Sequence, residues 1–151
     1  MTRSQAVGLG LVVLASCGDD QAGCEEDVRA QVIDERVTLE VGDESLEAEL
    51  ADDAVERERG WMHRRCDREA LLLVPDVRGE LPVWGCGLVD AVDLHFIRAG
   101  EVVEVVRDLL PCGPACGACP LVGEGIEVDA VLETPASELA AEQGAVVRGW
   151  P

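Results

Sequence analysis

The strongest constraint on the fold of this chain is an apolar stretch that runs from residue 81 to residue 106. Valine, leucine and isoleucine are frequent on both sides of the dipeptide Ala99-Gly100, and glycine permits the positive φ that a tight turn requires. The stretch therefore predicts a β-hairpin that turns at this dipeptide. A hairpin this apolar must be buried, so the rest of the chain has to supply elements that cover it.

Further strands and two short helices are predicted around this hairpin. Apolar and polar residues alternate over 37–41, 46–50 and 126–133, and a short apolar run covers 71–74. One helix is predicted over 54–59, after an aspartate cap, and another over 135–143, between Pro135 and Gly144. Because strands and helices do not alternate regularly, we expect an α+β fold: a small, mainly antiparallel β-sheet or barrel-like domain with two short helices.

The N-terminus predicts export and a lipid anchor. Arg3 precedes an apolar run over 6–14, which is too short to span a bilayer, and Leu14-Ala15-Ser16-Cys17 resembles the bacterial lipobox. We therefore expect a lipoprotein signal peptide over 1–16, a lipidated Cys17 with an acidic tether over 17–27, and a single domain over 28–151. The alternatives are an ordinary cleaved signal and a buried first strand.

The predicted location follows from this anchor. Gly18 rather than aspartate follows the cysteine, which in two-membrane bacteria resembles outer-membrane sorting. We expect a protein exported and lipid-anchored to the bacterial cell envelope, at the outer membrane facing the periplasm.

The charge of the chain argues against binding to nucleic acid. The formal net charge is −19, and the arginines over 57–68 are interleaved with acidic residues. The predicted partners are therefore the membrane, through the N-terminal lipid, and a protein or small molecule, but no nucleic acid. The chain contains no lysine, which excludes Schiff-base chemistry on that side chain.

Several short motifs, in order, identify a resemblance to a family. They are Arg59-Gly60-Trp61-Met62-His63-Arg64, Trp84-Gly85-Cys86-Gly87-Leu88, Asp93-Leu94-His95-Phe96-Ile97, Pro111-Cys112 with Cys119-Pro120, and Val131-Leu132-Glu133. This pattern resembles the family called domain of unknown function 192, over about residues 51–147. The resemblance implies a small β-rich domain of a kind that is often exported, and it does not indicate an activity. Where the family has the polar residues Lys-Asn-Thr, this chain has Cys86-Gly87-Leu88. The resemblance therefore does not imply that this chain binds a ligand through those polar side chains.

The cysteines predict disulfides. Without Cys17, an even number of cysteines remains for pairing in an oxidising compartment: Cys24, Cys66, Cys86, Cys112, Cys116 and Cys119. The family resemblance implies a bond between Cys112 and Cys119, and a bond between Cys66 and Cys86 is a guess.

Other chemistry is possible at the same cysteines. The spacing over 112–119 equals that of radical SAM iron–sulfur motifs, Cys116-x-x-Cys119 has the spacing of thioredoxin-type redox sites, and three thiolates with His63 or His95 could hold zinc. We expect structural disulfides, with no metal and no cofactor.

Asp93 and His95 lie two residues apart in a predicted strand, so they share a face and could act as an acid–base pair. The structural alternatives are a hydrogen-bonded aspartate, a core Trp84, and ion pairs of Arg59 or Arg64 with Asp93 or Glu133. No nucleophile is placed beside them, so we assign no catalytic residue. The candidate ligand site consists of Arg59, Arg64, Trp84, Asp93 and His95.

Together these features predict a membrane-anchored envelope lipoprotein whose disulfide-braced domain is a binding or interaction module. Two alternatives stay open: a thiol–disulfide redox protein that uses Cys116 and Cys119, and a small-ligand or hydrolase site around Asp93 and Trp84.

Overall fold

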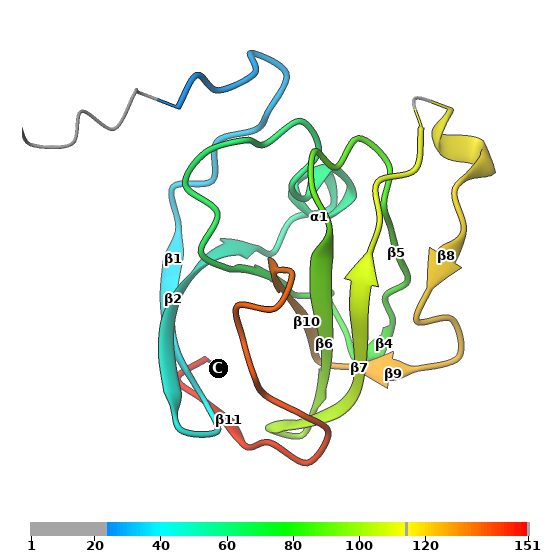
Figure 1. Ribbon diagram of the computed structural model, residues 1–151. Helices are drawn as coiled ribbons and strands as arrows, with labels where there is room; N and C mark the ends of the chain where they lie inside the picture. Colours follow the sequence, from blue (N-terminus) through cyan, green and yellow to red (C-terminus); the bar gives the residue numbers. More distant parts are fainter. Residues whose placement is uncertain (1–23, 114, 151) are drawn as a thin grey trace, which may run out of the picture.

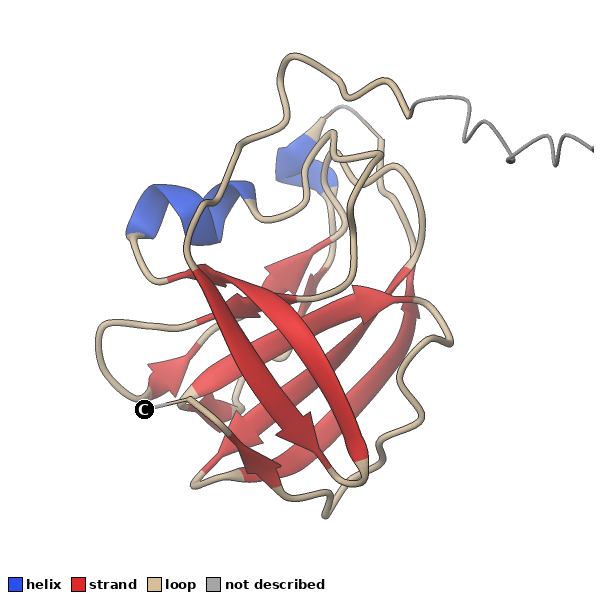
Figure 2. Ribbon diagram, turned by 90° about the vertical axis from the view of Figure 1, so that its left-hand side faces the viewer, coloured by secondary structure: helices blue, strands red, loops and turns tan. Residues whose placement is uncertain are grey.

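A seven-stranded sheet curls into a half-barrel in the computed structural model, which describes residues 24–113 and 115–150 (Figures 1 and 2). β2 and β3 pair in parallel, and the other neighbours in this sheet pair antiparallel. In spatial order the strands are β11 (Val147–Arg148), β1 (Arg36–Val41), β2 (Glu44–Ala51), β3 (Leu71–Leu73), β10 (Ala130–Pro135), β6 (Val92–Arg98) and β7 (Glu101–Leu109). The expectation of a mainly antiparallel, barrel-like sheet is confirmed, but the fold is mostly β rather than α+β, since α1 is the one α-helix of the described residues.

The C-terminal segment lies between the two edges of this sheet. β11 pairs with β1, and Val146, just before β11, forms an isolated bridge with Glu101 at the start of β7. The C-terminal segment thus forms one edge strand, β11, and through Val146 also contacts the other edge strand, β7.

The predicted hairpin at Ala99-Gly100, the strands predicted over 37–41 and 46–50, and the first helix are confirmed. β6 and β7 turn at Ala99 and Gly100, whose φ values are 54° and 74°, and β1 and β2 turn at Gly42. Helix α1 (Ala54–Arg59) begins at Asp53, whose carboxylate accepts hydrogen bonds from two backbone N–H groups of the first turn. These elements form where local turn and capping signals are strongest.

The predicted helix over 135–143 is wrong. Pro135 ends strand β10, and one turn follows, in which the N–H of Glu138 donates to the carbonyl oxygen of Pro135; other backbone groups bond to residues outside the segment. The N–H of Ser137 donates to Asp93, and the carbonyls of Leu139 and Ala141 accept from Arg107. These bonds hold the segment as a loop against the sheet. Apart from α1, the described residues contain one 3₁₀ turn, Cys116–Ala118.

The sheet separates two hydrophobic clusters. The cluster inside the half-barrel includes Leu39, Leu72, Ile97 and Leu132. The cluster on the outer face includes Trp61, Leu73, Leu94 and Phe96. Two small sheets help to cover it, formed by β4 (Gly79–Glu80) with β9 (Glu127–Val128) and by β5 (Val83–Trp84) with β8 (Leu121–Val122).

Three disulfides link loops to this framework: Cys24–Cys66, Cys86–Cys116 and Cys112–Cys119. The Cys112–Cys119 bond agrees with the family resemblance. The guessed Cys66–Cys86 bond is wrong because each of these cysteines has another partner. Cys116 and Cys119 belong to different bonds, so they do not form one redox pair in this structure.

The predicted signal peptide, Cys17 and the first part of the predicted tether lie outside the described residues. From Cys24 onward the segment is held to the domain, through the Cys24–Cys66 bond and hydrogen bonds from Arg65 and Cys66 to Glu26. Over the described part of the chain, no helix combines the length and the apolar character needed to cross a membrane.

Candidate functional site

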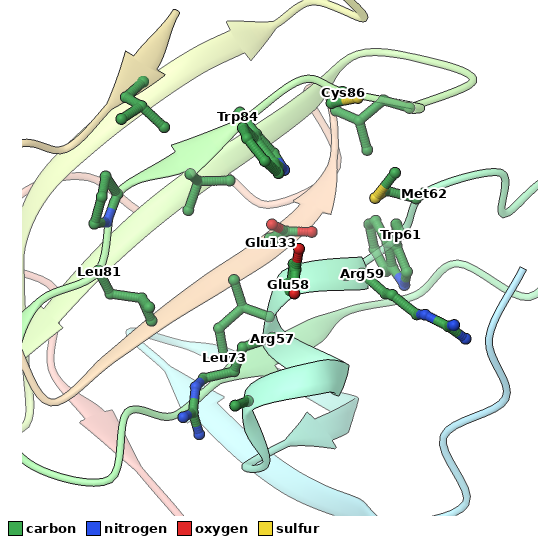
Figure 3. A pocket seen from close by; sticks show the side chains of 16 residues that line it. Arg57, Glu58, Arg59, Trp61, Met62, Leu73, Leu81, Trp84, Cys86 and Glu133 are labelled. Carbon is green, nitrogen blue, oxygen red and sulfur yellow. The ribbon is translucent and has the colours of Figure 1, made fainter. Parts of the chain in front are cut away.

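An apolar pocket of about 300 Å³ lies on the outer face of the sheet, between α1 and β5 (Figure 3). Leu73 and Glu133 come from the sheet itself, and the segment before and after β5 forms the opposite wall. The apolar lining includes Trp61, Met62, Leu73, Leu81, Trp84 and Leu88. A pocket of this size is suited to a small organic molecule.

Glycines on both sides of Cys86 set the path of the chain where Trp84, Cys86 and Leu88 form one wall of this pocket. A Cβ atom on Gly85 would lie 2.1 Å from the carbonyl oxygen of Leu110, so only glycine fits there. Gly87 has a φ of 68° and packs against the side chain of Met62. The Cys86–Cys116 bond ties this wall to the 3₁₀ turn.

The carboxyl group of Glu133 is the main polar feature of the pocket. The residue is 3% exposed, and Oε2 has no hydrogen-bond partner among residues 24–113 and 115–150. Burial raises the pKa of Glu133 to about 7. At neutral pH this group can therefore donate a hydrogen bond as the acid or carry a negative charge. Such a group in a pocket is a candidate for ligand recognition.

The charged residues of α1 lie around the pocket and differ in orientation. In Figure 3 the side chain of Glu58 points toward Glu133, and that of Arg59 extends away. Arg57 donates to the carbonyl oxygen of Val74 at 2.9 Å and to Asp76 at 3.2 Å. Arg57 is thus bound to groups other than Glu133.

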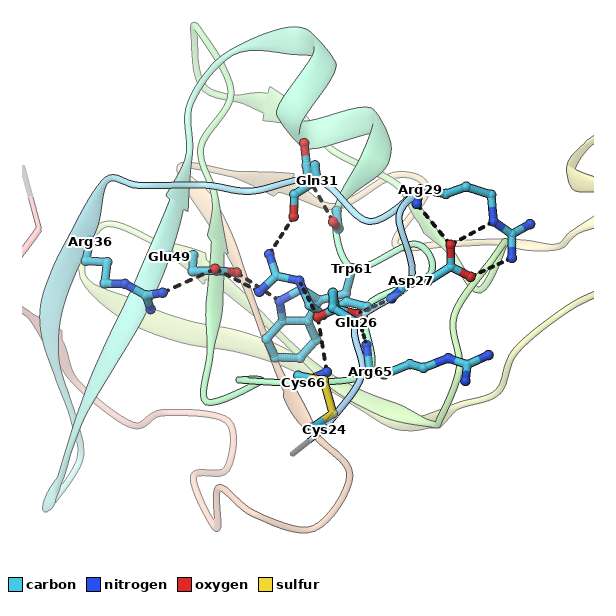
Figure 4. A network of polar contacts seen from close by, with 12 residues as sticks. Cys24, Glu26, Asp27, Arg29, Gln31, Arg36, Glu49, Trp61, Arg65 and Cys66 are labelled. Atoms are coloured by element: carbon cyan, nitrogen blue, oxygen red, sulfur yellow. Dashed lines mark hydrogen bonds and ion pairs between the residues drawn. A yellow bond between two sulfur atoms is a disulfide. The ribbon is translucent and has the colours of Figure 1, made fainter. Parts of the chain in front are cut away.

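Arg64 lies outside this pocket, in a buried polar network (Figure 4). Its Nη1 donates to Oε1 of Glu49 at 3.0 Å, and its Nη2 donates to the carbonyl oxygen of Gln31 at 2.8 Å. Trp61 donates from Nε1 to the other Glu49 oxygen at 3.2 Å. The partner of Arg64 is therefore Glu49 rather than Asp93 or Glu133. This network holds the segment before β1 against the sheet.

Asp93 also has a structural role. Its carboxylate accepts hydrogen bonds from Arg107 and from the backbone N–H groups of Asp108 and Ser137. Asp108 has a φ of 54° and lies where the β6–β7 register shifts, so Asp93 satisfies an N–H at an irregular position of the ladder. Although burial raises it, these hydrogen bonds hold the pKa of Asp93 below its usual value.

His95 shares the face of Asp93, as predicted, but that face lies inside the half-barrel. The imidazole is fully buried, and neither ring nitrogen has a hydrogen-bond partner in the described part of the chain. Burial, and to a lesser extent the positive charge of Arg107, lowers the pKa of His95 and favours the neutral ring. The outer pocket is on the other side of the sheet, so Asp93 and His95 do not form one site with Trp84.

The predicted ligand site is therefore divided among three places. Arg59 and Trp84 line the outer pocket, Arg64 belongs to the Glu49 network, and Asp93 and His95 face the barrel interior. The sequence pattern offers Glu133 only as an ion-pair partner. The signal that points to it is its place as an acid at the end of the strand predicted over 126–133. Within the described residues, no group of three metal-ligating side chains is positioned to hold an ion.

Comparison with known proteins supports a family and a fold. The sequence model of the family named DUF192, described as an uncharacterized ACR, matches residues 37–148. No curated protein matches the chain.

Two solved structures are similar at low identity. One is a protein from Sinorhizobium meliloti 1021 described as a candidate transcription regulator, with a TM-score of 0.68 and 22% identity over 79% of this chain and 97% of that chain. The other is a protein of unknown function from Novosphingobium aromaticivorans DSM 12444, with a TM-score of 0.68 and 18% identity over 86% of this chain and 94% of that chain. At such identities the likeness shows the fold alone.

Proposed function

The chain belongs to the DUF192 family, and we propose that it serves as a lipid-anchored protein of the bacterial cell envelope that binds a small apolar molecule. The binding site is the pocket between α1 and β5. The observation that carries this proposal is the unpaired carboxyl group of Glu133 beneath an apolar lining.

A ligand in this pocket has two sources of affinity. It removes apolar surface of Trp84, Leu81 and Met62 from water, at about 25 cal/mol per Å². It also supplies a hydrogen-bond partner to Glu133. Without a partner, the desolvation of a buried polar atom costs about 1–3 kcal/mol of free energy. Apolar walls with a single polar contact point are typical of small-molecule sites.

The proposed anchor rests on the sequence. Arg3, the apolar run over 6–14 and the lipobox-like Leu14-Ala15-Ser16-Cys17 support acylation of Cys17 after export. The three disulfides fit an oxidising compartment such as the periplasm. Gly18 supports sorting to the outer membrane.

Metabolic labelling tests the anchor. A palmitate analogue should label the wild-type protein and Cys24→Ser, whose cysteine belongs to a disulfide, but should not label Cys17→Ser. Equal labelling of the wild type and Cys17→Ser would contradict the proposal.

Thermal-shift measurements with phenyl- and indole-sized probes test the pocket. Bound probes should raise the melting temperature of the wild type, because a ligand that binds only the folded state stabilises it. Trp84→Ala should abolish the shift, whereas Trp150→Ala, which removes another half-buried indole outside this pocket, should retain it. A wild type that responds to none of the probes, or a Trp84→Ala variant that responds normally, would refute binding at this pocket.

A further inference from the structure

We propose that the pocket selects small apolar amines in their protonated form, with Glu133 as the buried counter-ion of the ammonium group. This inference rests on the proposed binding function and specifies the class of its ligand. It is carried by the distribution of charge and of aromatic rings in the pocket.

The carboxyl groups in the pocket oppose an anionic ligand. Glu133 lies at the base, and the side chain of Glu58 points toward it from α1 (Figure 3). In the described part of the chain no arginine forms an ion pair with Glu133, since Arg57 pairs with Asp76 and Arg59 extends away from the base. An ammonium group at the base would be attracted to both carboxyl groups in their ionised form, and a carboxylate ligand would be repelled by each of them in that form.

The walls also suit a cation. Trp61 lines the pocket although it is buried, and its indole N–H donates to Glu49, outside the pocket, so this polar atom is already satisfied. Trp84 contributes a second indole from β5. The negative face of an indole attracts a cation within about 6 Å of the ring centre. The same rings provide the apolar contact that an alkyl or aryl body requires.

Binding of an ammonium group should release a proton from Glu133. In the empty pocket the protonated carboxyl group is abundant near and below neutral pH, because burial disfavours the charged form. The ligand's positive charge favours the carboxylate, so the neutral acid and the ammonium ion form an ion pair and one proton goes to solvent. The other charged residues that line the pocket are Arg57, Glu58 and Arg59, all on α1. The flanking strands β3 and β5 contribute the uncharged residues Leu73, Val83 and Trp84.

Three ligands that share one phenyl group test the inference: 2-phenylethylamine, 2-phenylethanol and phenylacetate. Titration calorimetry on the oxidised, exported protein at pH 6.5 should show the amine binding at least about tenfold more tightly than the alcohol, and no binding of phenylacetate. Repeating the amine titration in buffers of different ionisation enthalpy should reveal proton release. The neutral alcohol should release none.

Variants connect the effect to Glu133. Glu133→Gln keeps the shape of the side chain and should weaken amine binding at least about tenfold while changing alcohol binding less than about threefold. Glu127→Gln, on the exposed face of β9, removes the same formal charge outside the pocket and should behave as the wild type.

The outcomes separate the two proposals. If the alcohol binds as tightly as the amine, or if amine binding by the wild type releases no proton, the cation inference is overturned while the binding function stands. If none of the three ligands binds and the thermal-shift probes also fail, the binding function itself is wrong. Proton release is measured on the wild type, so the test does not depend on a variant that folds.

Discussion

Replacing Glu133 with glutamine should make the stability of the protein less sensitive to pH. Burial raises the pKa of Glu133 from 4.5 to about 7, so between these values the folded state binds more protons than the unfolded state. The stabilisation that results is fully present below pH 4.5 and is lost as pH rises through 7. At about 1.4 kcal/mol per pKa unit, the loss between pH 5 and pH 8 is about 2 to 3 kcal/mol.

Urea unfolding followed by tryptophan fluorescence from pH 5 to pH 8 measures this effect. The free energy of unfolding of the wild type should fall relative to that of Glu133→Gln by about 2 to 3 kcal/mol over the range. Comparison of the two proteins cancels the titration of all other carboxyl groups. Glu127→Gln should parallel the wild type at every pH. A constant difference between the wild type and Glu133→Gln would refute the reasoning, because it would mean that Glu133 has the same pKa in the folded and unfolded states.

Three other substitutions test the framework around the pocket. Glu49→Ala should cost about 3–5 kcal/mol in urea unfolding because it removes the buried carboxylate that pairs with Arg64 at 3.0 Å, leaving this buried guanidinium group with the partly exposed Glu26, at 3.6 Å, as its remaining ion-pair partner. Glu47→Ala, with a half-exposed side chain on the same strand, should cost less than about 1 kcal/mol. Gly123→Ala should be about 1–3 kcal/mol less stable than Gly125→Ala, since both sites have positive φ but only at Gly123 does the new methyl group clash with a phenyl ring. Asp93→Ala should lower the melting temperature without changing ligand affinity. The difference in melting temperature should shrink below about pH 4, because the pKa of Asp93 is lower in the folded than in the unfolded state. The stability that this shift contributes is present above the unfolded-state pKa and is lost as pH falls.

The elements that the sequence predicts correctly depend on local signals. Asp53 caps α1 from within the same turn, and the Ala99-Gly100 dipeptide sets the β6–β7 turn without help from distant residues. The segment 135–143 also carries helix signals. Its backbone is held by Asp93 and Arg107, which lie more than 25 residues away in sequence, so no local pattern predicts the loop.

The disulfides and the candidate site show the same limit. Six cysteines allow 15 connectivities, and only the short Cys112–Cys119 loop is implied by the family resemblance. Strand alternation places Asp93 and His95 on one face, but it does not tell which face lines a pocket. Of the residues expected at a ligand site, Arg59 and Trp84 line the outer pocket. The role of Glu133 depends on α1 and β5 closing over β10, a packing that the sequence pattern does not specify.

The Cys24–Cys66 bond fixes how far the folded domain can travel from the proposed acyl group. If Cys17 is acylated, the connection between the acyl group and the domain ends at Cys24, because this residue and the ones that follow are fastened to the domain. A fully extended chain advances at most about 3.5 Å per residue, so this connection reaches no more than about 25 Å. The domain would then stay next to the lipid surface, and the pocket would sample molecules within that thin layer rather than throughout the periplasm.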